Sequence, residues 1–336
     1  MNTTPSQTKI FNYGFFGFIR INLRGVAQVM FQGNAWTGLL FLIGIFWGAY
    51  TTGYPTMAWG ALVGVLISTI TGFILDLPAD EGAQGLWGFN GVLVGCAFPA
   101  FMGNTPQMWI SLALCAALTT WVRMGMNSVM RPWKVNSFTF PFVQCTWFFL
   151  LAMYAMDALQ EGNHPHLLPH HTHLHLHFSN GWEMVQAWLR GVSQVFLIDS
   201  WVTGALFIIG LAIASRWAAL WACIGSALAM GTAYFMGVNG VQISEGLYGF
   251  SAVLTAIALA TVFYRPGVRS ALWALIGIII TVFVQAAMNH LVHPYGVATL
   301  TAPFCITTWL FLLPMLKLND EQPDHTSWHQ TAKQEK

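Results

Sequence analysis

Residues 24–29 read RGVAQV, and residues 190–195 read RGVSQV. A Thr-Gly pair begins eight positions after each hexamer ends, at Thr37 and at Thr203. The hexamer returns with one change, 166 positions later, in a chain of 336 residues. Such a return indicates that the chain is built from two related halves, and the question is how the halves are oriented to each other.

The composition indicates that the chain is surrounded by lipid rather than by water. Hydrophobic residues make up 56% of the sequence and charged residues 7%, whereas soluble globular domains carry about 25% charged residues. The net charge of +1 gives no basic surface for nucleic acid, so no nucleic-acid partner is expected. The five cysteines form no CxxC pair, and we interpret them as packing residues. The expected class is an all-α integral membrane protein, for which no cofactor is expected.

Apolar segments that could cross a membrane occur five times in each half. A crossing helix needs about 20 mostly apolar residues, and several of these segments are short and interrupted by glycine, which predicts broken or tilted helices. The segments are 36–50, 56–75, 86–102, 107–122 and 139–157, then 202–215, 217–236, 246–263, 270–289 and 300–316. The predicted division is a first repeat over 1–157, a His-rich linker over 158–182, a second repeat over 183–316 and a polar tail over 317–336.

The odd number of crossings determines how the two repeats are related. Five crossings end on the side opposite to the start, so a second copy must be inserted upside down, around a pseudo-two-fold axis in the membrane plane. Basic residues favour the cytoplasmic side of a membrane. With the N-terminus in the cytoplasm, twelve of the thirteen basic residues lie inside and Arg190 alone lies outside. The sequence therefore predicts ten transmembrane helices as two inverted five-helix repeats, with both termini cytoplasmic and the linker periplasmic.

Three blocks are shared by the two halves, in the same order. They are RGVAQVMFQGNAWTG (24–38) with RGVSQVFLIDSWVTG (190–204), GLWGFNGVL (85–93) with GLYGFSAVL (246–254), and SFTFPF (137–142) with TLTAPF (299–304). Each block alone also fits a helix–helix hydrogen bond, close packing of small residues or a proline kink. Together they place polar residues at membrane depth, where such residues face a bundle interior or a water-filled path. We expect the matched residues to gather near the two-fold axis: Gln28 with Gln194, Phe89 with Phe250, and Thr139 with Thr301.

The chemistry of these matched positions limits what a path between the halves could conduct. The matched polar side chains are neutral glutamines and threonines, and neither a ring of charge nor a carbonyl filter such as TVGYG is present. Aromatic and aliphatic walls with a few hydrogen-bond acceptors suit a small, flat, neutral solute with several N–H groups. Each hydrogen bond to water that such a solute loses must be replaced, because an unmade one costs about 1–3 kcal/mol.

The paired blocks resemble those of the urea transporter family, which includes the urea channels of bacteria and animals. The T-x-P-F part of the family's twice-occurring element stands at Thr139–Phe142 and at Thr301–Phe304. In both halves the Leu-Pro pair that opens this element in the family is replaced. The segment GLWGFNGVLVG (85–95) is also similar to the family's corresponding segment. Such a resemblance implies passive conduction of urea, a homotrimer with one pore in each protomer, and two flattened slots joined by a constriction.

The resemblance also implies roles for individual pore residues. Phe31, Phe89 and Leu93 would form one slot, and Leu197, Phe250 and Leu254 the other, with Val195 close by; Gln28 and Gln194 would accept hydrogen bonds along the slots, and Thr139 and Thr301 would flank the constriction. The family often has an aromatic residue where Leu197 stands. The location implied for a bacterial member is the inner membrane.

The run HPHLLPHHTHLHLH (164–177) holds seven of the eleven histidines. Imidazole is a common ligand of zinc, nickel and copper, so metal binding by His164–His177 is one interpretation. Sensing of pH is another, because histidine titrates near pH 6.5. The flanking proline and asparagine favour a solvated linker without a specific function, and we expect no metal to be required for transport.

Two other functions remain possible on sequence alone. A channel for another small neutral solute, such as ammonia, water or a short amide, is the nearest alternative, although the NPA triplet typical of water and glycerol channels is absent from the sequence. An intramembrane enzyme would need a nucleophile with a base, or a metal, at membrane depth. Neither H-E-x-x-H nor G-x-S-x-G occurs, so no enzyme activity is expected.

Overall fold

The computed structural model describes residues 14–159, 162, 178 and 180–314. Helices make up the first half in the order α1 (Gly14–Gln28), α2 (Ala35–Thr51), α3 (Pro55–Ile74), α4 (Ala79–Ala83), α5 (Phe89–Phe101), α6 (Pro106–Met130), the 3-10 helix η2 (Arg131–Trp133) and α7 (Phe140–Met153). The second half continues with α8 (Gly181–Ser193), the 3-10 helix η3 (Gln194–Phe196), α9 (Trp201–Ala214), α10 (Arg216–Phe235), α11 (Gly240–Ser244), α12 (Phe250–Ile257), the π-helical η4 (Ala258–Val262), α13 (Val268–Val292), η5 (His293–Tyr295) and α14 (Ala302–Leu312). The described part contains no β-strand, in agreement with the all-α prediction.

Side-chain caps and prolines mark where several of these helices begin. The Asn34 side chain accepts the N–H of Trp36 at the start of α2, and Ser200 accepts the N–H of Thr203 at the start of α9. These caps satisfy N–H groups that the first turn of a helix leaves without an internal partner. Pro55 and Pro106 open α3 and α6, positions where a missing N–H costs nothing.

The two halves repeat the same backbone irregularities. Phe31 and Leu197 have left-handed backbones with φ of 63° and 58°, and Phe138 and Leu300 follow with 50° and 51°. The offsets between partners are 166 and 162 residues, as in the shared blocks. A positive φ is costly for a bulky residue and is kept only where the surrounding fold imposes it. The same two interruptions in each half therefore indicate one backbone arrangement used twice.

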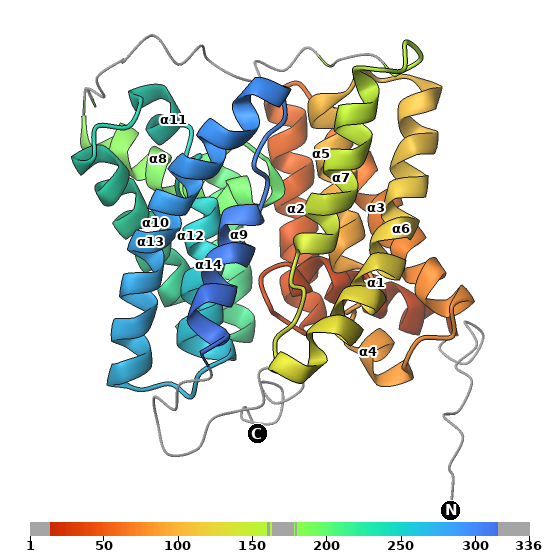
Figure 1. The fold of residues 1–336 in the computed structure, drawn as a ribbon, viewed down its shortest axis with the longest axis horizontal. Helices are drawn as coiled ribbons and strands as arrows, with labels where there is room; N and C mark the ends of the chain where they lie inside the picture. Colours follow the sequence, from red (N-terminus) through yellow and green to blue (C-terminus); the bar gives the residue numbers. More distant parts are fainter. Residues whose placement is uncertain (1–13, 160–161, 163–177, 179, 315–336) are drawn as a thin grey trace, which may run out of the picture.

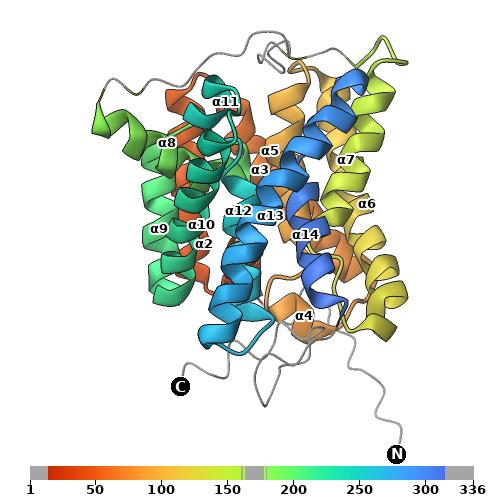
Figure 2. The same cartoon turned by 60° about the vertical axis from the view of Figure 1, so that its left-hand side comes forward.

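Contacts between the halves are reciprocal. Thr37 Oγ1 on α2 donates to Gly210 O on α9 at 2.7 Å, and Thr203 Oγ1 on α9 donates to Gly44 O on α2 at 2.7 Å. Phe41 and Phe207 are partners of each other, with ring centroids 4.8 Å apart, and α2 and α9 lie side by side in Figures 1 and 2. Such exchanged contacts are those of a two-fold axis.

A second reciprocal pair lies where the chain enters α7 and α14. The indole nitrogen of Trp147 donates to Ala298 O at 2.8 Å, and that of Trp309 donates to Asn136 O at 2.9 Å. Each tryptophan of one half therefore holds the extended segment that precedes the matching helix of the other half. The α7–α14 region is joined across the halves in the same way as the α2–α9 region.

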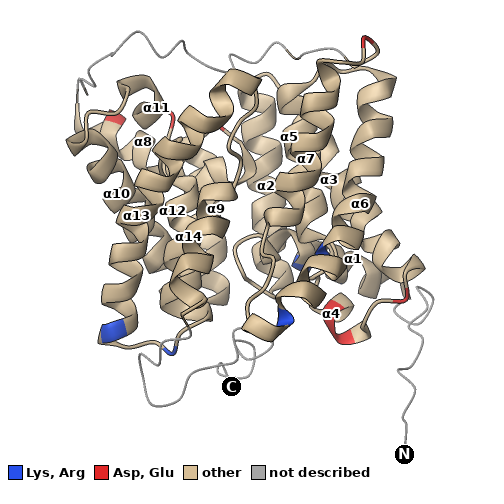
Figure 3. Ribbon diagram, in the orientation of Figure 1, with Lys and Arg blue, Asp and Glu red and all other residues tan. Residues whose placement is uncertain are grey.

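The long helices α6 and α13 run in opposite directions. In Figure 1, α6 descends from the upper end of the molecule toward η2, whereas α13 ascends from the lower end toward η5. The Lys and Arg visible in Figure 3 lie toward the lower end, and the middle of the helices carries almost no charged residue. The ends are thus polar and the middle apolar, as in a protein that crosses a bilayer.

Four helices are long and apolar enough to cross a membrane, and they match four predicted segments. They are Pro55–Ile74, Pro106–Trp133, Arg216–Phe235 and Val268–Tyr295. A pair bent by 73°, Gly181–Phe196 with Trp201–Ala214, would make a fifth. The apolar, membrane-spanning class is thereby confirmed. The count of ten crossings stays a prediction, because the helices at the remaining segments are shorter than a full crossing.

Several helices are shorter than a membrane crossing or lie outside the predicted segments. Helix α5 has 13 residues and buries twelve of them, and at 1.5 Å per residue it extends over about 20 Å, less than the ~30 Å of a hydrocarbon core. Interrupted backbone at this depth is tolerated where protein covers it. Helices α1, α4, α8 and α11 lie outside the ten predicted segments. The histidine run 164–177 and the tail 317–336 lie outside the described residues.

Candidate functional site

Thr139 and Thr301 meet between the halves. Their hydroxyl oxygens are 2.7 Å apart, and the two residues are 3% and 2% exposed. Each is the residue that precedes a short helix, Thr139 before α7 and Thr301 before α14. Equivalent residues of the two halves thus contact each other at a buried position, as expected for residues on a two-fold axis.

The T-x-P-F sequence explains how each threonine reaches that position. Phe138 and Leu300 turn the chain through a left-handed backbone just before the threonine. Pro141 and Pro303 then occupy the first turn of α7 and of α14, where proline fits a helix start. The turn directs the two helix N-termini, with their unbonded N–H groups and partial positive charge, toward the same buried region.

Cys305 makes the centre unsymmetrical. Its sulfur lies 3.4 Å from Thr139 Oγ1, and the matching position in the first half is Val143. The sequence offered no signal for this contact, because a single buried cysteine is usually a packing residue. Asn90 was also missed: its Oδ1 accepts the N–H of Phe142 at 3.2 Å and so connects α5 to the first turn of α7.

Gln28 and Gln194 make the same hydrogen bond in the two halves. Gln28 Nε2 donates to Gln84 O, and Gln194 Nε2 donates to Glu245 O, each at 3.0 Å. Gln84 is the C-cap residue that follows α4, and Glu245 is the one that follows α11. These helices lie at opposite ends of the molecule in Figure 1. The expectation that the glutamines gather at the axis is therefore wrong. Each is held near its own end because its amide nitrogen is fixed there, which leaves the amide oxygen as the acceptor.

Aromatic rings surround Phe31 on one side of the threonine pair. Phe31 is 8% exposed and meets Phe263 and Phe304 edge to face, with centroids 5.8 and 5.9 Å apart. Phe138 also contacts Phe263 and Phe304, at 5.2 and 5.5 Å. The prediction named Phe31 but missed its contacts with Phe263 and Phe304, since no spacing in the sequence connects residues so far apart.

The remaining first-slot residues lie on α5. Phe89 and Leu93 are both buried, and their spacing of four places them on one face of the helix. The guanidinium of Arg123 lies 5.8 Å from the centroid of the Phe89 ring and forms an ion pair with Glu81 at 2.8 Å. The Phe89 ring is thus held in place by Arg123, which is itself held by Glu81.

The second-slot residues match those of the first slot except that Leu197 replaces Phe31. Phe250 and Leu254 share one face of α12 and are buried. Val195 is fully buried, and Leu197 has the same left-handed backbone as Phe31. The side chain at this position contains a phenyl ring in the first half and an isobutyl group in the second, so the backbone frame is shared and the aromatic wall is not.

A cavity of about 1220 Å³ lies between residues of the two halves. Gln28, Phe31 and Gln84 belong to its lining, with residues of α1, α2, α10 and α13. Of the three first-slot residues, Phe31 belongs to this lining, whereas Phe89 and Leu93 do not.

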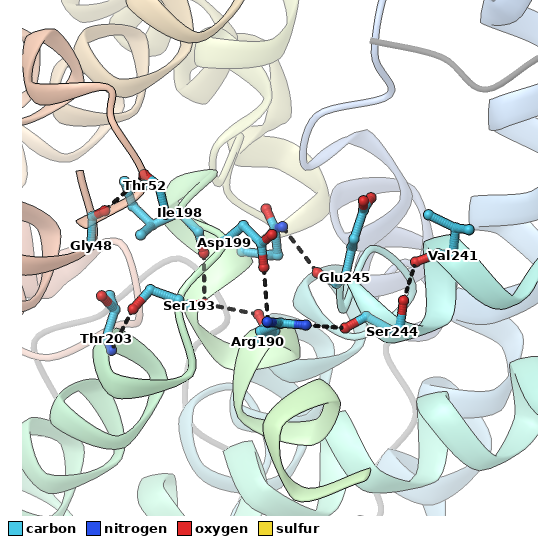
Figure 4. A network of polar contacts seen from close by, with 12 residues as sticks. Gly48, Thr52, Arg190, Ser193, Ile198, Asp199, Thr203, Val241, Ser244 and Glu245 are labelled. Carbon is cyan, nitrogen blue, oxygen red and sulfur yellow. Dashed lines mark hydrogen bonds and ion pairs between the residues drawn. The ribbon is translucent and has the colours of Figure 1, made fainter. Parts of the chain in front are cut away.

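The upper end carries a polar network, drawn in Figure 4. Arg190 Nε lies 3.0 Å from Asp199 Oδ1, and Arg190 Nη1 donates to Ser244 O at 3.1 Å. Burial raises the pKa of Asp199 above its ordinary value, and Arg190 opposes the shift. Burial and then the charge of Asp199 raise the pKa of Glu245, again against Arg190. Among the described residues no group of three or more His, Cys, Asp or Glu could hold a metal ion.

Comparison with known proteins identifies one family model and several relatives that are similar to this chain. A model of the urea transporter family matches residues 19–315. Urea transporter 1 of Ovis aries is 26% identical over 299 residues, which cover 88% of this chain and 77% of that protein. Urea transporter 1 of Mus musculus is 28% identical over 297 residues, covering 87% and 75%, and that of Rattus norvegicus is 27% identical over 307 residues, covering 90% and 77%.

Proposed function

Because the chain belongs to the urea transporter family, we propose that it carries urea passively across a membrane, along a path between its two halves. The protein is a transporter and not an enzyme. The observation that carries the proposed path is the buried hydroxyl pair of Thr139 and Thr301, which are 2.7 Å apart on the two-fold axis. A buried polar centre to which each half contributes one hydroxyl suits a solute that arrives from either end.

The proposed path matches the chemistry of urea. Urea is flat, so its faces can lie against aromatic and aliphatic side chains while its N–H groups donate at the edge. The first slot would be formed by Phe31, Phe89 and Leu93, and the second by Leu197, Phe250 and Leu254 with Val195. The amide oxygens of Gln28 and Gln194 and the hydroxyls of Thr139 and Thr301 would accept these N–H groups in succession.

Two inverted repeats with ten crossings form the second part of the proposal. The reciprocal hydrogen bonds between α2 and α9 and the opposite directions of α6 and α13 support it. Both termini would be cytoplasmic, and residues 158–182 would be periplasmic. A cysteine at exposed Met156 should react from outside with an impermeant thiol reagent, whereas one at exposed Lys134 should react only after permeabilisation. The reverse labelling pattern would exclude this orientation.

The assembly and location are proposed on the resemblance of the paired motifs. A homotrimer with one pore per protomer, in a bacterial inner membrane, would surround each path with protein on one side and lipid on the other. Many large apolar side chains, such as Trp36 and Leu114, are exposed in the single chain and would contact lipid or a neighbouring copy. Native mass spectrometry in mild detergent should detect three chains per particle.

Stopped-flow flux in liposomes tests the proposed solute. Purified protein should raise urea permeation well above the rate of empty liposomes, saturably and without an ion gradient. Methylurea, formamide, ammonia and water should be measured in the same vesicles. Equal acceleration of all of these solutes, or acceleration of ammonia or water without urea, would replace the urea assignment by that of a channel for another small neutral solute.

A further inference from the structure

Arg24 and Arg190 occupy matched positions at the two ends of the molecule. Arg24 Nη1 donates to Ala83 O at 2.7 Å, and Arg190 Nη1 donates to Ser244 O at 3.1 Å. Ala83 is the last residue of α4 and Ser244 the last residue of α11. Both guanidinium groups are therefore anchored in the same way, and their remaining nitrogen atoms can be compared directly.

Only the second-half arginine has a carboxylate partner from its own loop. Asp199 stands nine positions after Arg190, and its Oδ1 lies 3.0 Å from Arg190 Nε. The ninth position after Arg24 is Gly33. Among the described residues, the Nε atoms of Arg24 and Arg190 are both buried without a hydrogen-bond partner, but only that of Arg190 has a carboxylate within ion-pair distance. The first half thus keeps the cation and its anchor but lacks the anion.

The surroundings of Arg24 add positive charge. Arg20 precedes it by one helical turn, and both line the 1220 Å³ cavity together with Gly33 and Asn34. Burial, and then the charge of Arg20, lower the pKa of Arg24. The nearby carboxylate of Glu81 is engaged by Arg123 at 2.8 Å. A guanidinium in such a place is stabilised by any anion that reaches it.

There is room for such an anion beside Gly33. A Cβ added there would meet Gln28 Nε2 at 3.5 Å, an ordinary van der Waals distance. The same cavity is open toward the apolar exterior, where Phe16, Trp36 and Val268 are 84%, 69% and 78% exposed. An oxyanion could therefore arrive from the aqueous side or as the head group of a lipid whose chains lie along these residues.

We propose that Arg24, with Arg20, binds a phosphate-type oxyanion from outside the chain, in the place that Asp199 fills in the second half. A guanidinium presents several N–H donors in a planar fork that matches phosphate oxygens. This site is independent of which solute the protein transports. Free phosphate and the phosphate of an anionic lipid share the chemistry, and the experiment separates them.

The test uses the full chain in nanodiscs. In phosphatidylcholine discs, isothermal titration with inorganic phosphate should give one site per protomer. In discs of equal parts phosphatidylcholine and phosphatidylglycerol, a lipid occupant would abolish phosphate uptake, and native mass spectrometry would detect phosphatidylglycerol bound preferentially. Absence of both phosphate binding and phosphatidylglycerol preference would overturn the proposal.

Substitutions at the matched loop positions tie the binding to this site. Gly33→Asp supplies the missing carboxylate within the chain and should weaken oxyanion binding about 10- to 100-fold. Gly33→Asn has nearly the same size without the charge and should retain binding. Asp199→Gly should create a second site at the other end. Equal loss with Gly33→Asn and Gly33→Asp, or no loss with either, would overturn the assignment.

Discussion

The two halves share their backbone and differ at their ends and in their packing. The lower end has Arg20, Arg24 and Gly33, whereas the upper end pairs Arg190 with Asp199 and adds Glu245. The centre, by contrast, keeps a threonine from each half. A side chain at the centre contacts both halves, so a substitution there disturbs the packing of both, whereas a loop residue such as Gly33 or Asp199 affects only its own end.

The spacing between packed helices also differs between the two halves, and a substitution that tests this difference should have the largest effect on stability. A Cβ at Gly91 would overlap with Ser68 Oγ and Gly64 O, so Gly91→Ala should push α5 away from α3. Overpacking of this kind typically costs about 1–3 kcal/mol, and we expect the upper end of that range because backbone is involved. The matched residue in the second half is already Ala252. Thermal unfolding in detergent measures the loss.

The reverse substitution is the control for this prediction. In the second half, a Cβ at Gly225 would stand 3.0 Å from Ala252 O, so α10 and α12 are spaced to hold the alanine. Ala252→Gly should therefore cost only the roughly 0.5–1 kcal/mol of added chain entropy. If Gly91→Ala and Ala252→Gly destabilise the protein equally, the two halves do not differ in helix spacing.

Substitution of the central threonines should slow transport. Thr139→Val or Thr301→Val keeps the shape and removes one of two hydroxyls that are 2.7 Å apart. The expected increase in the barrier is about 1–2 kcal/mol, a slowing of roughly 5- to 30-fold in urea flux by stopped flow. The double variant should be slower still, while folded yield stays normal. Wild-type flux in both single variants would remove these hydroxyls from the path.

The fold class and the central pair could be predicted from the sequence because both depend on repetition. Matched blocks placed Thr139 and Thr301 in equivalent turns, and two-fold symmetry then brings equivalent residues together only if they lie on the axis. The same reasoning failed for Gln28 and Gln194, which are equivalent but off the axis. Distance from an axis is a three-dimensional quantity that a repeat alone does not contain.

Other parts of the site had no local signal. Phe263, which lies between η4 and α13, and Phe304 of α14 both contact Phe31. Such contacts depend on how the helices pack and not on spacing along the sequence. The short helices α4 and α11 have five residues each, too few for a periodic pattern. The significance of Gly33 depends on the contact between Asp199 and Arg190, which exists only in three dimensions.

Exchange of the slot residues tests whether the aromatic difference between the halves affects transport. Phe31→Leu removes two edge-to-face contacts, each worth about 0.5–1.5 kcal/mol beyond burial. We expect lower stability by about 1 kcal/mol and a several-fold weaker preference for urea over formamide in liposome flux. Leu197→Phe should sharpen that preference slightly. If the two variants change stability and selectivity equally, the ring at Phe31 has no special role.

The smallest expected effect concerns the pH dependence of the two ends. Burial and Asp199 raise the pKa of Glu245 above 4.5, so the charged form destabilises the fold at neutral pH. The penalty is relieved as pH falls through the raised pKa toward 4.5. Glu245→Gln should therefore stabilise the protein at neutral pH, by less than about 0.5 kcal/mol because the group is partly solvated, and the gain should vanish in acid.

The matched position at the lower end should respond with the opposite sign. Gln84 lines the cavity with Arg20 and Arg24, so the carboxylate in Gln84→Glu would lie near two cations, which lower the pKa of an acid. A lowered pKa gives stability that is present at neutral pH and is lost as pH falls through it. The difference in free energy of unfolding between the Glu form and the Gln form should therefore change with pH in one direction at position 245 and in the opposite direction at position 84. Parallel slopes would mean that the two ends have the same electrostatic character, and the difference between Gly33 and Asp199 would then have no consequence for charge.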